Sequence, residues 1–445
     1  MEHSKPARYR RYEKYELSAA SWQGLVPHHW KPTRFKHVLL DKRKTSNPSL
    51  EAGSISFGRV VFKDSENLAQ ETKDSYQEVL AGEYLVNPLN LNYDLLSLRT
   101  AMSEIDVVVS TGYIVLKSSG KLRPRYIRWL LHEFDVSHMK TLGAGVRQTI
   151  NYADIGNSYF SAPTDTEQEI IAAFLDHETA KIDALIEKQQ RLIELLKEKR
   201  QAVISHAVTK GLNPNAPMKD SGVEWLGEVP EHWQIYRLKR IIKSLESGVS
   251  VNAADTPALE NELGVLKTSC VYTRSFRVEE NKTVLKEEYP RLKCPIRKGA
   301  IIISRMNTPE LVGASAVVDV DQENIFLPDR LWQTIFSDDM DLNSQFLGFY
   351  MTHHGFRNQI SLAAEGASSS MQNIAKDDYL SIHAVLPSIA EQNSIVSFLD
   401  QALENLRLLE DQARTAINLM QERRTALISA AVTGKIDVRD WQAAA

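Results

Sequence analysis

The chain of 445 residues contains little cysteine and no long apolar segment. Its two cysteines, Cys270 and Cys294, lie outside any C-x-x-C pair, which argues against structural zinc and favours a reducing, cytoplasmic setting. No run reaches the roughly 18 apolar residues of a membrane-spanning helix, so no membrane partner is expected. The basic start of the sequence also lacks the apolar core of a secretory signal.

The overall charge is mildly acidic, but it is unevenly distributed. The formal net charge is −4, while residues 1–44 hold 11 Lys or Arg against 4 Asp or Glu. A second basic cluster, "KLRPRYIR", covers residues 121–128. A local basic surface can attract phosphate even when the whole chain is acidic. For the first 16 residues, a solvated terminal segment is an equally good interpretation.

Two pairs of segments repeat along the chain and define its organisation. The phrase "WQGLVPHHWKPTRFK" from Trp22 returns without a gap as "WLGEVPEHWQIYRLK" from Trp225, 203 residues later. A longer pair starts at Pro163 and Pro387, 224 residues apart, and about 18 of its 47 aligned positions are identical. The chain is therefore a tandem duplication with a period of about 210 residues, which predicts a pseudo-twofold internal repeat.

Each copy of the longer segment is expected to form one long helix. Thr164 with Glu167 matches the S/T-x-x-E capping box, in which the two side chains satisfy backbone donors at a helix start. Ser388 with Glu391 matches the same motif in the second copy. At about 1.5 Å of rise per residue, some 45 residues make a rod about 65 Å long.

Apolar residues recur along both expected helices about every 3.5 residues, which is typical of a coiled-coil seam. The seam positions are Ile171, Leu175, Ile182, Leu185, Leu192, Leu196 and Val203 in the first copy and Ile395, Leu399, Leu406, Leu409, Met420 and Leu427 in the second. Because a single helix cannot bury such a stripe, the two helices are expected to pack together. Since each globular region precedes its helix, an antiparallel pair is the simplest connection.

The regions before the helices contain short apolar runs such as "IDVVVSTGYIVL" and "AIIIS", interrupted by glycine, proline and asparagine, as is typical of strands. The sequence therefore predicts an α+β protein in which two mixed α/β domains are joined by two long helices forming an antiparallel coiled coil. The expected boundaries are 1–20 for a basic N-terminal arm, 21–162 for the first domain, 163–212 for the central helix, 213–386 for the second domain and 387–445 for the C-terminal helix and tail.

Several motifs together resemble the specificity (S) subunit of type I restriction-modification enzymes. They are "SGVEWLGEVPEHW" from Ser221 with its copy at Trp22, "RMNTPELVG" from Arg305, "RQTINYADI" from Arg147, and "PSIAEQNSIVSFLD" followed by "ALISAAVTGKIDVR". The resemblance covers the chain from about Tyr12 to Trp441. No single motif decides it, but the combination and the duplicated layout are highly specific.

The resemblance implies a function for each part of this layout. By this resemblance, the two domains are target recognition domains, and each reads one part of a bipartite, asymmetric site in double-stranded DNA. The paired helices act as a spacer and as the docking surface for two modification subunits, which use S-adenosylmethionine to methylate adenine. Restriction subunits that use ATP and Mg join this core. The chain itself holds no catalytic centre and no cofactor, and works in the cytoplasm.

Two other classes of function remain as alternatives. A self-contained DNA methyltransferase needs an N-P-P-Y loop, but "NPLN" from Asn87 lacks its second proline and its aromatic residue, so a turn is expected there. "VTGK" near Gly434 lacks the glycine spacing of an ATP-binding P-loop. The adjacent pairs His28–His29 and His353–His354 point in opposite directions in an extended chain and make poor metal ligands. A coiled-coil assembly protein without a DNA-reading role is the second alternative.

DNA contacts need side chains that can reach base edges or phosphates, chiefly Arg, Lys, Asn and Gln. The candidates near glycine, serine or turn signals are Arg59, Lys63, Arg99, Arg147 and Gln148 in the first half and Lys267, Arg274, Arg277, Arg305, Asn307, Gln372 and Asn373 in the second. Gln148 and Gln372 occupy equivalent positions in the two halves. A structural or phosphate-binding role is therefore favoured for both, because the halves are expected to read different bases.

Overall fold

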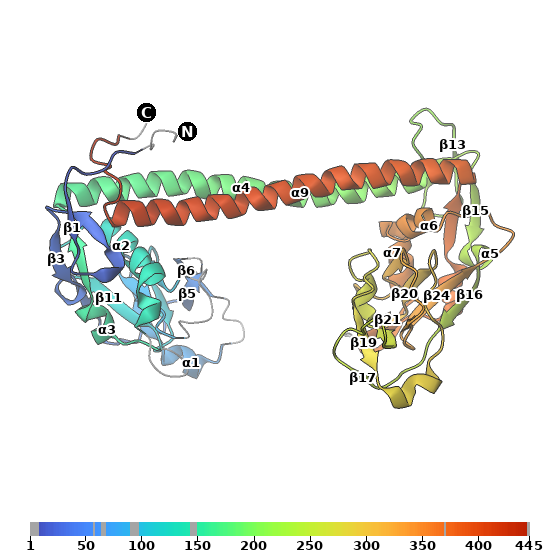
Figure 1. Cartoon of the computed structure of the whole chain (residues 1–445), viewed down its shortest axis with the longest axis horizontal. Coiled ribbons are helices and arrows are strands. Elements are labelled where there is room, and N and C mark those ends of the chain that lie inside the picture. Colours follow the sequence, from blue (N-terminus) through green and yellow to red (C-terminus); the bar gives the residue numbers. More distant parts are fainter. Residues whose placement is uncertain are drawn as a thin grey trace. The chain divides into compact units, whose positions relative to one another are not determined.

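The computed structural model describes residues 9–56, 58–63, 68–89, 98–142, 149–368 and 371–442, with side chains for all of these except 365–368. The chain forms two compact units: unit 1 comprises residues 1–190 and 414–445, and unit 2 comprises residues 191–413 (Figure 1). Among the described residues, no helix combines the length and the apolar character needed to cross a membrane.

Unit 1 is built from twelve short strands and three helices in its described part, together with portions of the two long helices. The strands are β1 (Tyr15–Leu17), β2 (Leu25–Pro27), β3 (Lys31–Arg34), β4 (Leu39–Asp41), β5 (Gly53–Ser56), β6 (Arg59–Phe62), β7 (Gln77–Val79), β8 (Tyr84–Val86), β9 (Thr100–Met102), β10 (Val107–Val109), β11 (Ile114–Ser118) and β12 (Tyr159–Ala162). The helices are α1 (Gln70–Asp74), α2 (Pro124–Ser137) and α3 (Tyr152–Asn157).

The central sheet of unit 1 has the strand order β4-β11-β8-β9, with every neighbouring pair antiparallel. Smaller ladders join β1 to β2, β3 to β12, β5 to β6 and β7 to β10. Three buried phenylalanines connect α2 to these strands: the ring of Phe35 lies 4.7 Å from that of Phe134 and 4.8 Å from that of Phe160. Burial of such large apolar rings supplies much of the stability of a small core.

Unit 2 repeats this plan with additional strands. Its strands are β13 (Met218–Asp220), β14 (Glu228–Pro230), β15 (Gln234–Arg237), β16 (Ile242–Ser247), β17 (Ala253–Ala254), β18 (Gly264–Leu266), β19 (Asn281–Val284), β20 (Ile301–Ser304), β21 (Met306–Asn307), β22 (Ser315–Val317), β23 (Ile325–Phe326), β24 (Leu331–Phe336), β25 (Glu365–Ser368), β26 (Met371–Asn373) and β27 (His383–Leu386). Its helices are α5 (Leu238–Ile241), α6 (Ser344–Tyr350), α7 (His354–Ala363) and α8 (Lys376–Ser381).

The central sheet of unit 2 has the order β16-β24-β20-β22, again antiparallel throughout. In both central sheets, the strand that comes last in the sequence pairs with the first and the second. The ladders β13–β14 and β15–β27 match β1–β2 and β3–β12 of unit 1. Unit 2 adds the sheets β17-β19-β18-β23 and β21-β26-β25, which have no counterpart of the same strand order in the described part of unit 1.

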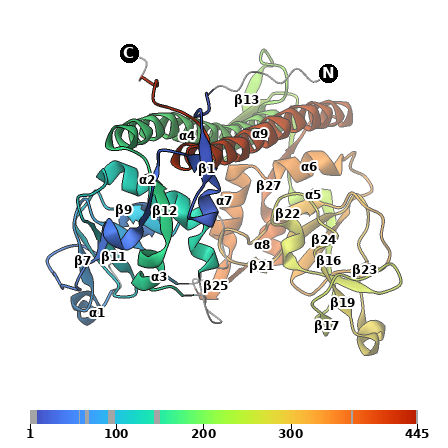
Figure 2. The ribbon, with the colours of Figure 1, turned by 60° about the vertical axis from the view of Figure 1, so that its left-hand side comes forward.

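The two long helices, α4 (Asp165–Lys210) and α9 (Ile389–Val432), each contribute to both units. In unit 1 they lie side by side and run in opposite directions (Figure 2). Asp183 of α4 forms an ion pair with Arg424 of α9 at 2.8 Å, whereas Phe174, earlier on α4, contacts Trp441 beyond the end of α9.

In unit 2 the opposite portions of the two helices meet. The core there includes Ile204 and Val208 near the end of α4, together with Ile395 and Leu399 near the start of α9. Each unit therefore places the start of one long helix beside the end of the other.

The repeated phrase contacts both long helices within its own unit. In unit 1, His29 Nε2 lies 2.8 Å from Glu167 Oε1 at the start of α4. Gly434, which follows the end of α9, lies against Pro27 and Trp30, so that a Cβ at this position would be only 2.3 Å from Pro27 Cδ. Its φ of 71° also favours glycine.

The second copy of the phrase makes the corresponding contacts in unit 2. His232 Nε2 lies 2.8 Å from Glu391 Oε2 at the start of α9, and Trp233 Nε1 donates to Glu391 Oε1 at 3.0 Å. Gly211, which follows α4, lies against Trp233 and Pro230. The phrase is repeated because each copy holds the start of one long helix next to the end of the other.

The two predicted helix caps differ in detail. Glu167 N–H donates to Thr164 Oγ1 at 3.4 Å and Thr164 N–H donates to Glu167 Oε2 at 3.0 Å, so the first capping box is confirmed. In the second, Glu391 N–H donates to Ser388 Oγ at 3.3 Å, but the Glu391 carboxylate accepts from Trp233. The second box is therefore only half formed, because its carboxylate serves the repeated phrase instead.

The predicted seam is correct at some positions and wrong at others. Leu185, Leu192 and Leu409 are 47%, 40% and 47% exposed, while Ile193 is buried. An α-helix with 3.6 residues per turn drifts by about 20° per heptad relative to a strict seven-residue repeat. The buried stripe of α4 consequently moves from Ile182 to Ile193, so that Leu185 and Leu192 face outward while Leu175 and Leu196 stay buried.

The described part of the N-terminal arm is packed rather than solvated. Arg10 forms an isolated β-bridge with Asp437 after the end of α9. Tyr12 is buried, and the Tyr15 hydroxyl donates to the Gly434 carbonyl at 3.1 Å. From Tyr9 onward, the arm is thus part of unit 1.

Both cysteines are free thiols within unit 2. Burial raises the pKa of Cys270, which is fully buried. Burial and the nearby Glu246 carboxylate raise the pKa of Cys294 to about 11. Neither thiol is ionised at neutral pH.

Candidate nucleic-acid interface

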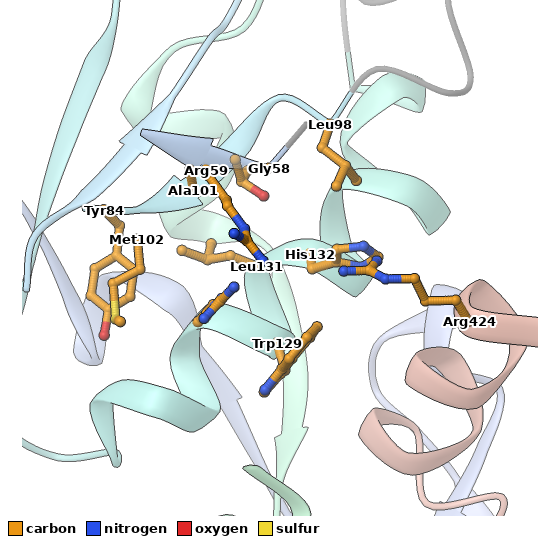
Figure 3. A pocket seen from close by; sticks show the side chains of 12 residues that line it. Gly58, Arg59, Tyr84, Leu98, Ala101, Met102, Trp129, Leu131, His132 and Arg424 are labelled. Atoms are coloured by element: carbon orange, nitrogen blue, oxygen red, sulfur yellow. The ribbon is translucent and has the colours of Figure 1, made fainter. Parts of the chain in front are cut away.

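Arg59 is the predicted contact of unit 1 with the most specific surroundings. It lies on β6 and lines a small pocket whose wall includes Trp129 and His132 of α2 and Arg424 of α9 (Figure 3). Arg128 lines the same pocket. Basic side chains from a strand, a short helix and a long helix therefore converge on one place in unit 1.

Among the basic side chains of this pocket, Arg59 is the one best placed to bind an anion. Arg128 pairs with Glu104 at 3.6 Å and Arg424 pairs with Asp183, whereas Arg59 forms no ion pair with a described residue. Burial, with the charges of Arg424 and Arg128, lowers the pKa of His132 to about 3, so the imidazole is neutral.

The remaining candidates of unit 1 are less constrained. Lys63 follows β6 and has an exposed side chain. The backbone N–H groups of Arg99 and Thr100 both donate to one carboxylate oxygen of Asp135, which sets the position of Arg99 at the start of β9. Burial raises the pKa of Asp135 to about 6, against the lowering effect of these hydrogen bonds. Arg147 and Gln148 lie outside the described residues.

Two candidates of unit 2 are already paired with carboxylates. Lys267 Nζ lies 3.3 Å from Asp255 Oδ1. Arg277 lies 3.3 Å from Glu280 Oε1 and donates to the Ser269 carbonyl at 3.2 Å. These contacts stabilise the loop around the sheet β17-β19-β18-β23 and reduce the charge that either side chain offers to DNA.

The polar candidates of unit 2 meet on the sheet β21-β26-β25. Asn307 lies opposite Gln372, and Asn373 follows on the same strand. Asn307 Nδ2 donates to the Tyr272 hydroxyl at 2.7 Å, and its own side-chain oxygen accepts from the next backbone N–H, so its hydrogen-bonding groups are used within unit 2. Gln372 is half-buried, and its Oε1 has no described hydrogen-bond partner. Asn373 is exposed.

Arg305 and Arg274 lie at turns in unit 2. Arg305 connects β20 to β21, and its backbone N–H donates to the Arg330 carbonyl at 3.1 Å. Arg274 has a φ of 64°, which is uncommon for a residue with a side chain. Arg357 of α7, which is not among the predicted contacts, also contributes a guanidinium whose Nη1 is buried. Its only sequence signal is its place between Phe356 and Ile360 in an amphipathic segment, which does not separate it from other surface arginines.

His353 and Asn87, which belong to motifs with catalytic or metal-binding potential, make structural contacts. His353 Nδ1 accepts a hydrogen bond from Gly355 N–H at the start of α7. Asn87 Oδ1 accepts from Leu89 N–H at 3.2 Å, and Asn90, the last residue of the motif predicted to form a turn, lies outside the described residues. Within the described ranges, no three His, Cys, Asp or Glu side chains are grouped in a way that could hold a metal ion.

Comparison with known proteins gives relatives by sequence and by fold. The chain is 22% identical over 231 residues to the type I restriction enzyme EcoEI specificity subunit of Escherichia coli, an alignment that covers 52% of this chain and 38% of that protein. A chain from a structural study of complex assembly and conformational transition of the type I R-M system has 15% identity and a TM-score of 0.67, covering 92% of this chain and 98% of that one.

The resemblance to type I specificity subunits is confirmed. The HsdS subunit from Thermoanaerobacter tengcongensis has 16% identity and a TM-score of 0.49, covering 92% of this chain and 98% of that subunit. No protein-family model matches the chain. This chain spans 38% of the length of the curated specificity subunit, and the fold likeness to the first structure extends over nearly the whole chain.

Proposed function

We propose that the chain is the DNA sequence-recognition subunit of a type I restriction-modification complex. In this proposal the mixed α/β portions, residues 21–162 and 213–386, are target recognition domains, and each reads one half of a bipartite, asymmetric site in double-stranded DNA. The observation that carries the proposal is that the central sheets of units 1 and 2 share one strand order and are surrounded by different additional strands. A shared frame with divergent attachments is what two readers of different half-sites require.

The long helices α4 and α9 act as an antiparallel spacer and as the docking surface for two modification subunits. Exposed leucines along both helices support this role. They are Leu185 and Leu419 in unit 1 and Leu192, Leu195, Leu408 and Leu409 in unit 2. Apolar side chains concentrated on otherwise charged helices favour partner docking. A duplicated surface on one chain suits two identical partners related by a near-twofold axis.

Catalysis belongs to the partner subunits in this proposal. The modification subunits bind S-adenosylmethionine and methylate adenine, and restriction subunits supply ATP-dependent cleavage. The chain contributes recognition, spacing and assembly. Purified alone, it is expected to transfer no methyl group, and methylation by the isolated chain would contradict the proposal.

Mapping of methylated bases tests the function directly. In cells that express the chain with its modification partner, we expect adenine methylation at one bipartite site. Exchange of residues 45–140 for those of a relative is expected to change one half-site and leave the other intact. A change in both half-sites would contradict the assignment of one reader to each half.

The spacer role has its own test. Insertion of about seven residues, or two helical turns, near Gln189 adds about 10 Å to a helix that rises about 1.5 Å per residue. We expect the gap between the half-sites to change while both half-sequences persist. An unaltered gap in the methylation map would contradict a rigid spacer.

Salt dependence separates DNA reading from a purely structural coiled-coil role. Neutralisation of several phosphates makes the DNA affinity fall steeply as salt is added, whereas association through apolar surface responds weakly. A steep slope for the assembled complex is therefore the expected result. Absence of any DNA affinity would favour an assembly protein instead.

A further inference from the structure

Arg357 of α7 is held in place by backbone carbonyls rather than by a carboxylate. Its Nη2 donates to the carbonyl oxygens of Val312 at 2.6 Å and Glu310 at 3.2 Å. Its Nη1 is buried and has no hydrogen-bond partner within the described residues. Gly313 permits this arrangement, because a Cβ there would lie 3.0 Å from Arg357 Nη1 and 2.6 Å from Ile360 Cδ1. One edge of the guanidinium is thus fixed and the other is left unpaired.

Arg274 brings a second guanidinium to this part of unit 2. Tyr272, two residues before it, accepts a hydrogen bond from Asn307 Nδ2, which also donates to Ser304 Oγ. Arg274 Nη1 is also buried without a partner among the described residues, and the φ of 64° at Arg274 places the backbone in the left-handed region. Such backbone strain persists where the surrounding structure holds it and is common at functional sites. Burial, together with the positive charge of Arg274, lowers the pKa of Arg357 to about 10. Burial likewise lowers the pKa of Arg274.

No negative charge in the described part of unit 2 compensates these two cations. Neither Arg274 nor Arg357 forms an ion pair there. The neighbouring Tyr379 is fully buried, its hydroxyl donates to Met351 Sδ at 3.5 Å, and burial raises its pKa, so it remains neutral. Two buried like charges without a counter-charge are unfavourable. An anion from outside the chain resolves this imbalance.

The position of the pair links it to the candidate DNA contacts. Gly313, which supports Arg357, donates its N–H to the Ser304 carbonyl at 2.6 Å, and Ser304 immediately precedes Arg305. The Arg305 carbonyl in turn accepts from Ile374 N–H, two residues after Gln372. The arginine pair therefore adjoins the turn and the sheet that carry the predicted polar contacts of unit 2.

We propose that Arg274 and Arg357 together bind one phosphate group of the DNA backbone, as an anchor that positions unit 2 without reading sequence. This inference rests on the proposed function. The planar guanidinium presents paired donors that match the oxygens of a phosphate. Contacts to phosphate fix the register of a protein on the duplex, while base contacts supply specificity.

The test uses the chain assembled with its modification subunits and carrying Arg274→Gln. We expect the affinity for target and non-target duplexes to fall equally, by about fivefold, and the slope of log affinity against log salt to decrease by about 0.9, the value for one phosphate. Arg274→Lys keeps the charge and is expected to retain most of the slope. Arg240→Gln is the matched control, because Arg240 is exposed and paired with Asp339 at 2.6 Å.

The melting temperature of the free chain supplies the second measurement. Because Arg274→Gln removes repulsion from Arg357, we expect this temperature to stay unchanged or to rise. If the loss of DNA affinity were caused by misfolding, the melting temperature would fall instead. In that case Arg357→Lys, which keeps the charge of the pair, provides the second variant. A salt slope that is identical in wild type and Arg274→Gln contradicts the inference.

Three further outcomes distinguish the sources of the anion. Stabilisation of the wild type by inorganic phosphate alone, abolished by Arg274→Gln without any change in DNA affinity, would assign the site to free phosphate and overturn the DNA assignment. Loss of modification-subunit binding in place of DNA binding would assign it to an acidic protein surface. Failure of the wild-type complex to bind any DNA would refute the proposed function itself.

Discussion

Unit 1 and unit 2 build the same four-stranded antiparallel sheet from strands in the same chain order, yet they surround it differently. Unit 1 adds the ladders β5–β6 and β7–β10, whereas unit 2 adds a four-stranded and a three-stranded sheet. The shared architecture of the two units includes the repeated phrase, which contacts the long helices. The divergent strands surround this common frame, so one frame can carry two different binding surfaces.

The two copies of the phrase also differ in how they use the same residue types. Trp233 Nε1 donates to Glu391, whereas Trp30 Nε1 is buried without a partner among the described residues. Both glutamates contact a histidine of the phrase, but in unit 1 the carboxylate of Glu167 completes the cap of α4 instead of accepting from the tryptophan. Equivalent positions therefore contribute unequally to the free energy of unfolding, and substitutions can measure the difference.

The largest effect is expected for the glycines that follow the long helices. Gly434→Ala places a Cβ 2.3 Å from Pro27 Cδ, whereas the nearest atom at Gly211 is 3.2 Å away. Both residues also adopt a positive φ. We expect unit 1 to lose about 3 kcal/mol in Gly434→Ala through overpacking and strain, and unit 2 about 1 kcal/mol in Gly211→Ala.

Hydrogen exchange with mass spectrometry resolves the two units and is the appropriate measurement, since a chain with two units need not unfold in one step. The contrast between the glycines disappears if Pro27 can move aside at no cost. Equal losses of protection in both variants would show this.

The next effect concerns the buried imidazole of unit 1. His132 has a pKa lowered from 6.5 to about 3 by burial, so unfolding takes up a proton at acid pH. This contribution to stability is present above pH 6.5 and is lost as pH falls toward 3. By pH 5, wild type should have lost about 2 kcal/mol relative to His132→Gln, because one pKa unit corresponds to about 1.4 kcal/mol.

Urea unfolding at pH 7 and pH 5, followed by proteolysis and mass mapping, tests this difference in unit 1. Asp135, whose pKa is raised to about 6 by burial, acts in the opposite sense in both proteins and cancels in the comparison. Identical pH dependence in the two proteins would mean that the pKa of His132 is the same in the folded and unfolded states.

A smaller effect separates the two tryptophans of the repeated phrase. Trp233→Phe removes the donor that Glu391 uses, whereas Trp30→Phe removes a donor that has no described acceptor. Beyond the similar loss of ring volume, we expect Trp233→Phe to cost about 1–2 kcal/mol more. Denaturant titration of each variant, read by exchange protection in its own unit, provides the measurement. An equal cost at both positions would indicate that Trp30 also has an acceptor.

The smallest effect on stability is expected for the exposed leucines of the long helices. Leu192→Ser with Leu408→Ser should change the free energy of unfolding by less than about 0.5 kcal/mol per substitution, because the side chains are 40% and 46% exposed. Binding of the modification subunit, measured by calorimetry, should weaken. Leu362→Ser on α7, where the side chain is 81% exposed, is the matched control and should leave binding intact. Equal binding by all variants would move the docking surface elsewhere.

The long helices and the first capping box were predictable because their signals are local. Helical spacing and the motif from Thr164 to Glu167 depend on residues within one or two turns. The burial of Ile193 rather than Leu192 was not predictable, since it depends on which face of α4 packs against α9. The candidate interface was harder still. In the sequence, Lys267 is as plausible a DNA contact as any other lysine. Only the fold shows that Asp255 lies beside it and pairs with it.

Arg357 is a second residue whose role could not be predicted from the sequence. Its sequence context is an ordinary amphipathic helix, and nothing near it in the chain signals an anion. The unpaired guanidinium becomes visible only once Arg274, some 80 residues earlier in the sequence, lies in the same environment. Charge imbalance is a property of tertiary structure.

The scarcity and burial of the cysteines have a practical consequence. Cys270 is inaccessible and Cys294 has a pKa of about 11, so neither reacts readily with maleimides near neutral pH. Cysteines introduced at Leu17 and Leu259, which are 78% and 71% exposed, therefore provide two selective attachment points, one in each unit, without removal of the native thiols. A donor and acceptor dye at these points would report, molecule by molecule, whether the two units keep a constant separation when DNA is added.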